Sequence, residues 1–280
     1  MSVVAAAFAG AVMAALLWRA IQPTFAAELF RRRNYRDVDV PTAVGVIIPI
    51  AVLCVEATIT IVDALGADVD AATISGRRLA LLAAVGFSLL GLLDDLGGTG
   101  QSGGFRGHLG EAARGRLTTG AVKLFGGAAL AIVVVAAGTE GRSLGRLVAD
   151  AALVALAANL ANLLDRRPGR VTKATGAAFA VLAVATGFGA ELVGPALVVG
   201  AGLGLLLPDL RERCMLGDAG ANPLGAAVGV GVVLACSPGV RVAALVAVGA
   251  LNLASELVSF TRVIDRTPPL RFLDRLGRPS

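Results

Sequence analysis

Two adjacent carboxylates end an apolar stretch of this sequence. Asp94 and Asp95 lie in GLLDDLGG (91–98), directly after LALLAAVGFSLL (79–90). Neighbouring carboxylates at a helix end repel each other unless a cation neutralises them, and Mg²⁺ takes oxygen ligands such as one or two carboxylates plus substrate phosphates. A solvated helix end would explain this pair by itself, so the pair indicates a metal site only together with other polar groups.

A third acidic position lies in a glycine-flanked turn. Asp218 occupies GDAGAN (217–222), where another apolar stretch begins. An aspartate at this place could simply cap the following helix. Alternatively, the glycines would allow a tight backbone, and the helix N-terminus would present N–H groups to an anion. Both interpretations stay open for Asp218 alone.

The longest polar cluster is NLANLLDRRPGRVTKA, at residues 159–174. Asn159, Asn162 and Asp165 recur every third residue, which places them within about 120° on one face of a helix. This stripe offers oxygen and N–H groups but no nucleophile, so it suits a metal, a ribose or a base. Guanidinium groups bind phosphate, and the basic residues behind the stripe are Arg166, Arg167, Arg170 and Lys173. A basic loop on the inner side of a membrane would explain the arginines but not the stripe.

The elements that must position these residues are long apolar segments. Of the 280 residues, 56% are hydrophobic and 16% are charged, and the mean hydropathy is +0.79. A soluble domain is about a quarter charged. Apolar runs near the ~20 residues that a helix needs to cross a bilayer recur along the whole chain. The sequence therefore predicts an all-α, polytopic transmembrane helix bundle in one domain, 1–280, with a tail at 263–280.

Nine spans are expected, of which the second contains Glu56 and the seventh is short. Three cysteines without paired spacing indicate neither a disulfide framework nor a zinc site. The predicted spans are 2–22, 43–64, 78–96, 119–138, 145–164, 173–192, 194–209, 221–237 and 240–262.

The basic residues predict the orientation. Eighteen of the 25 Lys and Arg residues lie in one set of alternate loops, including loop 97–118, and five lie in the other set. The positive-inside rule then places the N-terminus outside and the C-terminus in the cytoplasm of a bacterial-type plasma membrane. It also explains the net charge of +5 without nucleic acid as a partner.

On this topology the polar clusters share the cytoplasmic side, where NYRDVDVPTAVG (34–45) joins them. Lys123, a few residues inside the apolar segment TTGAVKLFGG (118–127), could extend to the membrane surface or reach a diphosphate. Together the clusters offer a divalent metal site, phosphate-binding cations and a polar pocket of nucleotide size. Metal-assisted phosphoryl transfer involving a lipid fits this set.

In this order, the motifs resemble those of the polyprenyl-phosphate N-acetylhexosamine-1-phosphate transferase superfamily, over residues of about 34 to 265. PTAVG (41–45) is similar to its Pro-x-x-Gly-Gly loop, and GLLDDLGG to its Asp-Asp motif. NLANLLD (159–165) is similar to the front of its Asn-x-x-Asn-x-x-Asp-Gly-x-Asp-Gly motif, and MLGDAGANPLG (215–225) to its Met-Gly-Asp-x-Gly-Ser loop. Lys123 matches a lysine of the family. The superfamily includes the phospho-MurNAc-pentapeptide translocase and GlcNAc-1-phosphate transferases.

The resemblance implies an enzyme that uses Mg²⁺, with Mn²⁺ as an alternative, to move a sugar-1-phosphate from a nucleotide-sugar such as UDP-HexNAc to a polyprenyl phosphate, releasing the nucleoside monophosphate. Its catalytic residues would be Asp94, Asp95 and Asp218, with Asp218 and Asp94 as metal ligands. Lys123 would neutralise phosphate charge. The substrate-binding residues would further include Asn159, Asn162, Asp165, Arg166, Arg167 and Arg170. Relatives often pair, so a homodimer is compatible with the small-residue spans.

The sequence also departs from the family pattern. Pro168 stands where the family has its second aspartate, and the histidine motif of the relatives is missing. A catalytically silent relative, acting as a scaffold or lipid-binding partner in cell-envelope assembly, is therefore the alternative. A transporter would need charges at the bilayer midplane, for which Glu56 is the main candidate. A CDP-alcohol phosphotransferase would need an Asp-Gly-x-x-Ala-Arg signature, which this sequence lacks.

Overall fold

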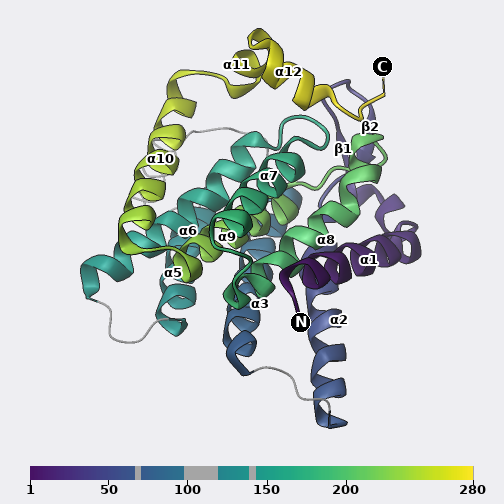
Figure 1. Ribbon diagram of the computed structural model, residues 1–280. Coiled ribbons are helices and arrows are strands. Elements are labelled where there is room, and N and C mark those ends of the chain that lie inside the picture. Colours follow the sequence, from purple (N-terminus) through teal and green to yellow (C-terminus); the bar gives the residue numbers. More distant parts are fainter. Residues whose placement is uncertain (67–70, 98–118, 139–142, 280) are drawn as a thin grey trace.

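The computed structural model describes residues 1–66, 71–97, 119–138 and 143–279. Within these ranges the chain is a bundle of helices, with a small β-hairpin at one end (Figure 1). Residues 98–118 of the predicted basic loop (97–118) lie outside the described residues. The nine longest helices are α1 (Val3–Ile21), α2 (Ile47–Ala64), α3 (Ala71–Gly97), α5 (Thr119–Ala137), α6 (Leu144–Leu164), α7 (Arg170–Ala185), α8 (Val193–Leu210), α9 (Asp218–Ala235) and α10 (Pro238–Leu257).

Shorter elements connect or follow these helices. Strands β1 (Arg31–Arg33) and β2 (Asp39–Pro41) pair antiparallel, with Arg32 opposite Val40. This hairpin was not expected from the sequence. The remaining short elements are the 3₁₀ turns η1 (Thr24–Ala26), η2 (Glu28–Phe30), η3 (Val44–Val46) and η4 (Ala190–Leu192), and the C-terminal helices α11 (Phe260–Arg266) and α12 (Pro268–Arg275).

Eight helices of the described chain are long and apolar enough to cross a membrane. This confirms the predicted helical character and supports a multi-pass membrane protein, whereas the number of spans and their sidedness stay predictions. Helix α7 is the exception among the nine, because its 16 residues fall short of the ~20 that span a bilayer. The expected segment 173–192 was therefore too long. The chain turns after α7 through Gly187 and Phe188, both with left-handed backbone angles (φ 67° and 58°).

The third helix begins earlier than expected and contains one partner of a buried ion pair. The sequence placed this start at residue 78, but α3 already begins at Ala71. Arg77 thus lies inside the helix, where it is 4% exposed, and its Nε is 2.9 Å from Oε1 of Glu56 on α2. Pairing makes both charges tolerable at a buried position. It also gives Glu56 a structural partner, which weakens its candidacy as a transport residue.

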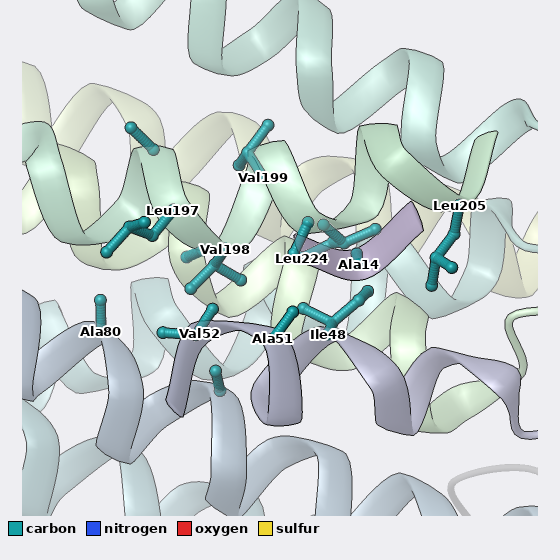
Figure 2. Packing of buried hydrophobic residues seen from close by; sticks show 14 of the residues in the cluster. Ala14, Ile48, Ala51, Val52, Ala80, Leu197, Val198, Val199, Leu205 and Leu224 are labelled. Atoms are coloured by element: carbon teal, nitrogen blue, oxygen red, sulfur yellow. The ribbon is translucent and has the colours of Figure 1, made fainter. Parts of the chain in front are cut away.

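The core is built from small and branched apolar side chains on several helices. Figure 2 shows Val52 of α2, Leu197 and Val198 of α8 and Leu224 of α9 among the residues packed together. Helix α9 is buried along most of its length. In contrast, none of the residues of α10, all of which the structure describes, is buried. Helix α9 therefore lies inside the bundle, and α10 lies at its outside.

Glycines on α8 allow α1 to lie directly against it. A methyl group added at Gly200 would overlap the carbonyl oxygen of Ala7, and one added at Gly204 would overlap that of Ala11. Small residues spaced four apart are typical of closely packed membrane helices. This contact places α1 along the outside of α8 (Figure 1).

We expect Gly200→Ala to destabilise the chain by about 1–3 kcal/mol, because the added methyl group overpacks the contact between α1 and α8. Thermal unfolding in detergent measures the effect. Gly249→Ala on α10 is the matched control, since a methyl group there meets nothing within 4 Å; its effect should stay within about 0.5 kcal/mol. Equal effects of the two substitutions would contradict the close contact.

Candidate functional site

Asp95 joins the end of α3 to the start of α9. Its Oδ1 accepts a hydrogen bond from the backbone N–H of Asp218, and its Oδ2 accepts one from the N–H of Ala219, both at 3.0 Å. The carboxylate therefore caps the positive end of α9 from another helix. The two helices touch at Gly91, where a methyl group would overlap the backbone of Asp218.

Asp218 is the centre of a group of polar side chains from four helices. Lys123 of α5 forms an ion pair with Oδ2 of Asp218, and its Nζ is 3.7 Å from Oδ2 of Asp94. Asn162 of α6 donates a hydrogen bond of 3.2 Å from its Nδ2 to the same Oδ2 of Asp218. We call Asp94, Asp95, Lys123, Asn162 and Asp218 the acidic cluster. The structure thus brings together five residues that the sequence singled out in separate motifs.

The loop at residues 41–46 packs against the residues that precede Asp218. Backbone N–H groups of Val44 and Gly45 donate to the carbonyl oxygens of Met215 (3.2 Å) and Leu216 (2.9 Å). In return, the N–H of Met215 donates to the carbonyl oxygen of Pro41 at 2.7 Å. The PTAVG stretch is therefore a neighbour of the acidic cluster.

The other two members of the predicted stripe, Asn159 and Asp165, lie outside the acidic cluster. Asn159 donates from Nδ2 to Oδ1 of Asn252 on α10, at 2.7 Å, and so points away from Asp218. Asp165 follows the last residue of α6 and caps its C-terminal end. Burial, and then the charges of Asp209, Asp218 and Asp95, raise the pKa of Asp165 well above its ordinary value. Asp165 therefore extends the acidic cluster towards α8.

The side chains of Arg166 and Arg167 have different surroundings. Arg166 is exposed. The guanidinium carbon of Arg167 is 4.2 Å from the ring centroid of Tyr35, a cation–π contact with the loop of the hairpin. The Tyr35 hydroxyl donates to Oε1 of Glu212 at 3.0 Å. Arg167 is thus held at the hairpin loop, and neither arginine forms a hydrogen bond or ion pair with the acidic cluster in the described chain.

Arg170 and Lys173 hold the C-terminal segment. The Nε and NH2 groups of Arg170 donate to the two carboxylate oxygens of Asp274 at 2.7 and 3.0 Å, and its NH1 donates to Thr261 at 2.9 Å. Lys173 donates to the carbonyl oxygen of Asp274 at 2.6 Å. Arg170 is only 4% exposed. Its guanidinium is therefore committed to the chain itself, whereas the sequence assigned it to a phosphate.

Sequence reasoning missed Asp209 and Asp274. Asp209 ends the apolar helix α8 in LLLPDL (205–210), and its Oδ2 accepts the backbone N–H of Gly169 at 2.8 Å. The signal that drew attention to Asp94, a carboxylate ending an apolar stretch, would also have found Asp209. For Asp274, nothing in the sequence indicates that Arg170 is its partner.

The donor set of the acidic cluster suits a hard divalent cation. Asp94 and Asp218 share one ammonium, and their side chains are 29% and 20% exposed, so their oxygens remain reachable. Among the described residues, no three acidic, His or Cys side chains form a complete metal site. Asp94 and Asp218 with one substrate phosphate would supply the oxygen ligands that Mg²⁺ usually takes. Asp94 and Asp218 are therefore the two oxygen donors available to the cation that the motif resemblance implies.

Comparison with known protein families finds no matching family model, and comparison with curated proteins finds no match. A function for the chain must therefore be inferred from the chemistry of the acidic cluster and from the motifs themselves.

Removing the ammonium of the acidic cluster should destabilise the chain. In Lys123→Met, Asp94 and Asp218 lose their shared counter-charge, and we expect a loss of about 1–3 kcal/mol, below the ~3–5 kcal/mol of a fully buried pair because these side chains are partly exposed. Adding Asp218→Asn should recover part of the loss. A double-mutant cycle by thermal unfolding in the presence of a chelator measures this coupling. Strictly additive effects would contradict it.

The contact of Asp274 should survive throughout the neutral pH range. Burial alone would raise the pKa of Asp274, but Arg170 and Arg278 lower it below its ordinary value. Stabilisation by this carboxylate is thus complete above its ordinary pKa and is lost only as the pH falls through the lowered value. We expect Asp274→Asn to increase hydrogen exchange and proteolysis in residues 260–278 at neutral pH. Asp265→Asn, at an exposed position, is the control.

Proposed function

We propose that this chain is a membrane phosphoglycosyl transferase, which moves a sugar-1-phosphate from a nucleotide-sugar to a polyprenyl phosphate. The observation that carries the proposal is the meeting of Asp94, Lys123, Asn162 and Asp218 beside the loop at 41–46. These groups come from four helices that are far apart in the sequence. The motifs that resemble those of the polyprenyl-phosphate N-acetylhexosamine-1-phosphate transferases are the same ones that meet in space.

The reaction depends more on neutralising the negative charge of the phosphates than on a strong base. An oxygen of the lipid phosphate forms a bond to the phosphorus that carries the sugar, and the bond from that phosphorus to the nucleoside monophosphate breaks. Negative charge gathers on both phosphates, so catalysis depends on positioning and on nearby cations. When bound, Mg²⁺ would neutralise charge on the diphosphate. Asp218 and Asp94 would hold it, and Lys123 would neutralise further phosphate charge.

The two adjacent carboxylates have different roles in this proposal. Both oxygens of Asp95 already accept backbone N–H groups, so Asp95 is a positioning residue that fixes the start of α9. Asp94 is partly exposed and keeps an oxygen near Lys123. Asp94 is therefore the carboxylate that can orient the lipid phosphate and take its proton if one is present. Asn162 would keep Asp218 in its orientation.

Basic groups near the acidic cluster would attract the anionic substrates. Arg32 on β1 is exposed, and its NH2 donates to the carbonyl oxygen of Asp95 at 3.3 Å. Arg166 is exposed beside Asp165. These two are better suited to a phosphate than the buried Arg170. The bias of basic loops supports a site on the cytoplasmic face of a bacterial-type plasma membrane, with a homodimer as a compatible assembly.

The second candidate, a catalytically silent relative, has an observation in its favour. Asp218 is paired with Lys123 and bonded to Asn162, while Asp95 is used as a cap, so the acidic cluster also holds the fold together. A scaffold in cell-envelope assembly would need this arrangement for stability alone. Activity of the purified chain separates the two candidates.

The decisive experiment measures release of nucleoside monophosphate by purified protein with polyprenyl phosphate, Mg²⁺ and a panel of UDP- and other nucleotide-sugars. We expect release that requires the lipid and falls on the order of 100-fold or more in Asp218→Asn, since one preorganised charge contact is worth that much. Asp265→Asn, which lies away from the acidic cluster, should retain activity. Silence of folded wild-type protein across the panel would favour the scaffold.

A further inference from the structure

The last described residues form a helical segment that crosses one end of the bundle. We call residues 260–278, with α11 and α12, the tail segment. It begins three residues after α10 ends at Leu257, and Figure 1 shows it running from α10 towards the β-hairpin. Because α10 is long and apolar enough to span a membrane, the tail segment starts at a membrane surface.

One side of α12 is fixed to the bundle. Asp274 is 7% exposed and accepts hydrogen bonds from Arg170, and from Arg278 at 2.8 Å. The Nε of Arg278 also donates to the carbonyl oxygen of Pro168 at 2.9 Å. Lys173 binds the backbone carbonyl of Leu276 at 3.2 Å. These contacts set both the position of α12 and its rotation about its own axis.

The opposite side of α12 is apolar and exposed. Phe272 is 67% exposed, Leu273 56% and Leu276 55%. At about 100° per residue, Phe272 and Leu276 lie roughly 160° from Asp274 on the helix. The side chains of Phe272 and Leu276 are thus held away from the contacts of Asp274, and Leu273, about 100° from Asp274, lies beside them. In water this arrangement would be unfavourable, since such side chains are normally buried.

Two arginines border this apolar surface. Arg271 and Arg275 are exposed, and with Pro268, Phe272 and Leu276 they form one open surface of the tail segment. The spacing of Pro268, Arg271, Phe272 and Arg275 is i, i+3, i+4 and i+7, which forms one continuous helix face. A helix with apolar and basic residues on adjoining parts of its exposed surface is typical of proteins that lie in the membrane interface. Positive charge there complements anionic headgroups.

We propose that the tail segment is an interfacial anchor that binds anionic phospholipid in the protein's own membrane. Phe272, Leu273 and Leu276 enter the boundary between headgroups and acyl chains, and Arg271 and Arg275 bind lipid phosphates. Asp274 and Arg170 hold α12 in the rotation that this requires. The proposal depends on insertion of α10 in a membrane and not on transferase activity, so the two can fail separately.

Depth-dependent fluorescence quenching tests the anchor on the full-length chain. The sequence has one tryptophan, Trp18, so Trp18→Phe with Phe272→Trp places a single reporter on α12. The protein is reconstituted in nanodiscs of phosphatidylcholine, with or without phosphatidylglycerol, and brominated phosphatidylcholine is the quencher. We expect a blue-shifted emission and strong quenching with phosphatidylglycerol, and weak quenching without it. Thermal unfolding shows that the reporter variant is folded.

Variants that lack the two arginines test whether positive charge attracts α12 to the anionic lipid. Each arginine near an anionic surface favours association roughly fivefold, so Arg271→Ala with Arg275→Ala should lower the ratio of inserted to free α12 by roughly 30-fold. The matched control is Arg146→Ala, because Arg146 is exposed near the start of α6, away from the tail segment; it should leave the quenching unchanged.

Three results would overturn the proposal. They are quenching that is the same with and without phosphatidylglycerol, a reporter that no brominated lipid reaches, and an emission shift that follows protein concentration instead of lipid composition. The last result would mean that a second copy of the chain covers the apolar surface.

Discussion

The cap that Asp95 forms on α9 is the contact on which the polar end of the bundle depends. Both carboxylate oxygens are used, at 3.0 Å to successive N–H groups, so α3 and α9 have a fixed register. Asp218 is the first residue of α9, and this register brings it to Lys123 and Asn162. The contact is feasible only because glycine at position 91 lets the two backbones touch.

Charge balance distinguishes the acidic cluster from three other carboxylates of the described chain. Glu56 pairs with Arg77, Asp150 with Arg241, and Asp274 with Arg170 and Arg278. Each of these carboxylates has at least one guanidinium of its own. In the acidic cluster, Asp94 and Asp218 share the ammonium of Lys123, and Asp95 accepts two backbone N–H groups. Two carboxylates that share one ammonium keep an excess of negative charge, which is the feature that the proposed cation-dependent role would use.

The sequence predicted the helices well because apolar runs of spanning length leave a chain little choice in a bilayer. It was less successful at their ends. Helix α3 begins early, at Ala71, and so includes Arg77, which pairs with Glu56; α7 ends early, before Gly187 and Phe188 turn the chain. Both outcomes depend on partners or backbone angles that hydropathy does not report. The hairpin escaped prediction because its strands have only three residues each.

For the candidate site, the sequence by itself determined which residue types are available at helix ends, and that Asn162, Lys123 and Asp218 could meet at one side of a bundle. Tertiary structure decided which of them do. The stripe on α6 divides, with Asn162 facing Asp218 and Asn159 facing Asn252. Arg167 goes to Tyr35, and Arg170 to Asp274. Helical periodicity places side chains around an axis, but the neighbouring helices that complete each hydrogen bond or ion pair are distant in sequence, and only packing brings them there.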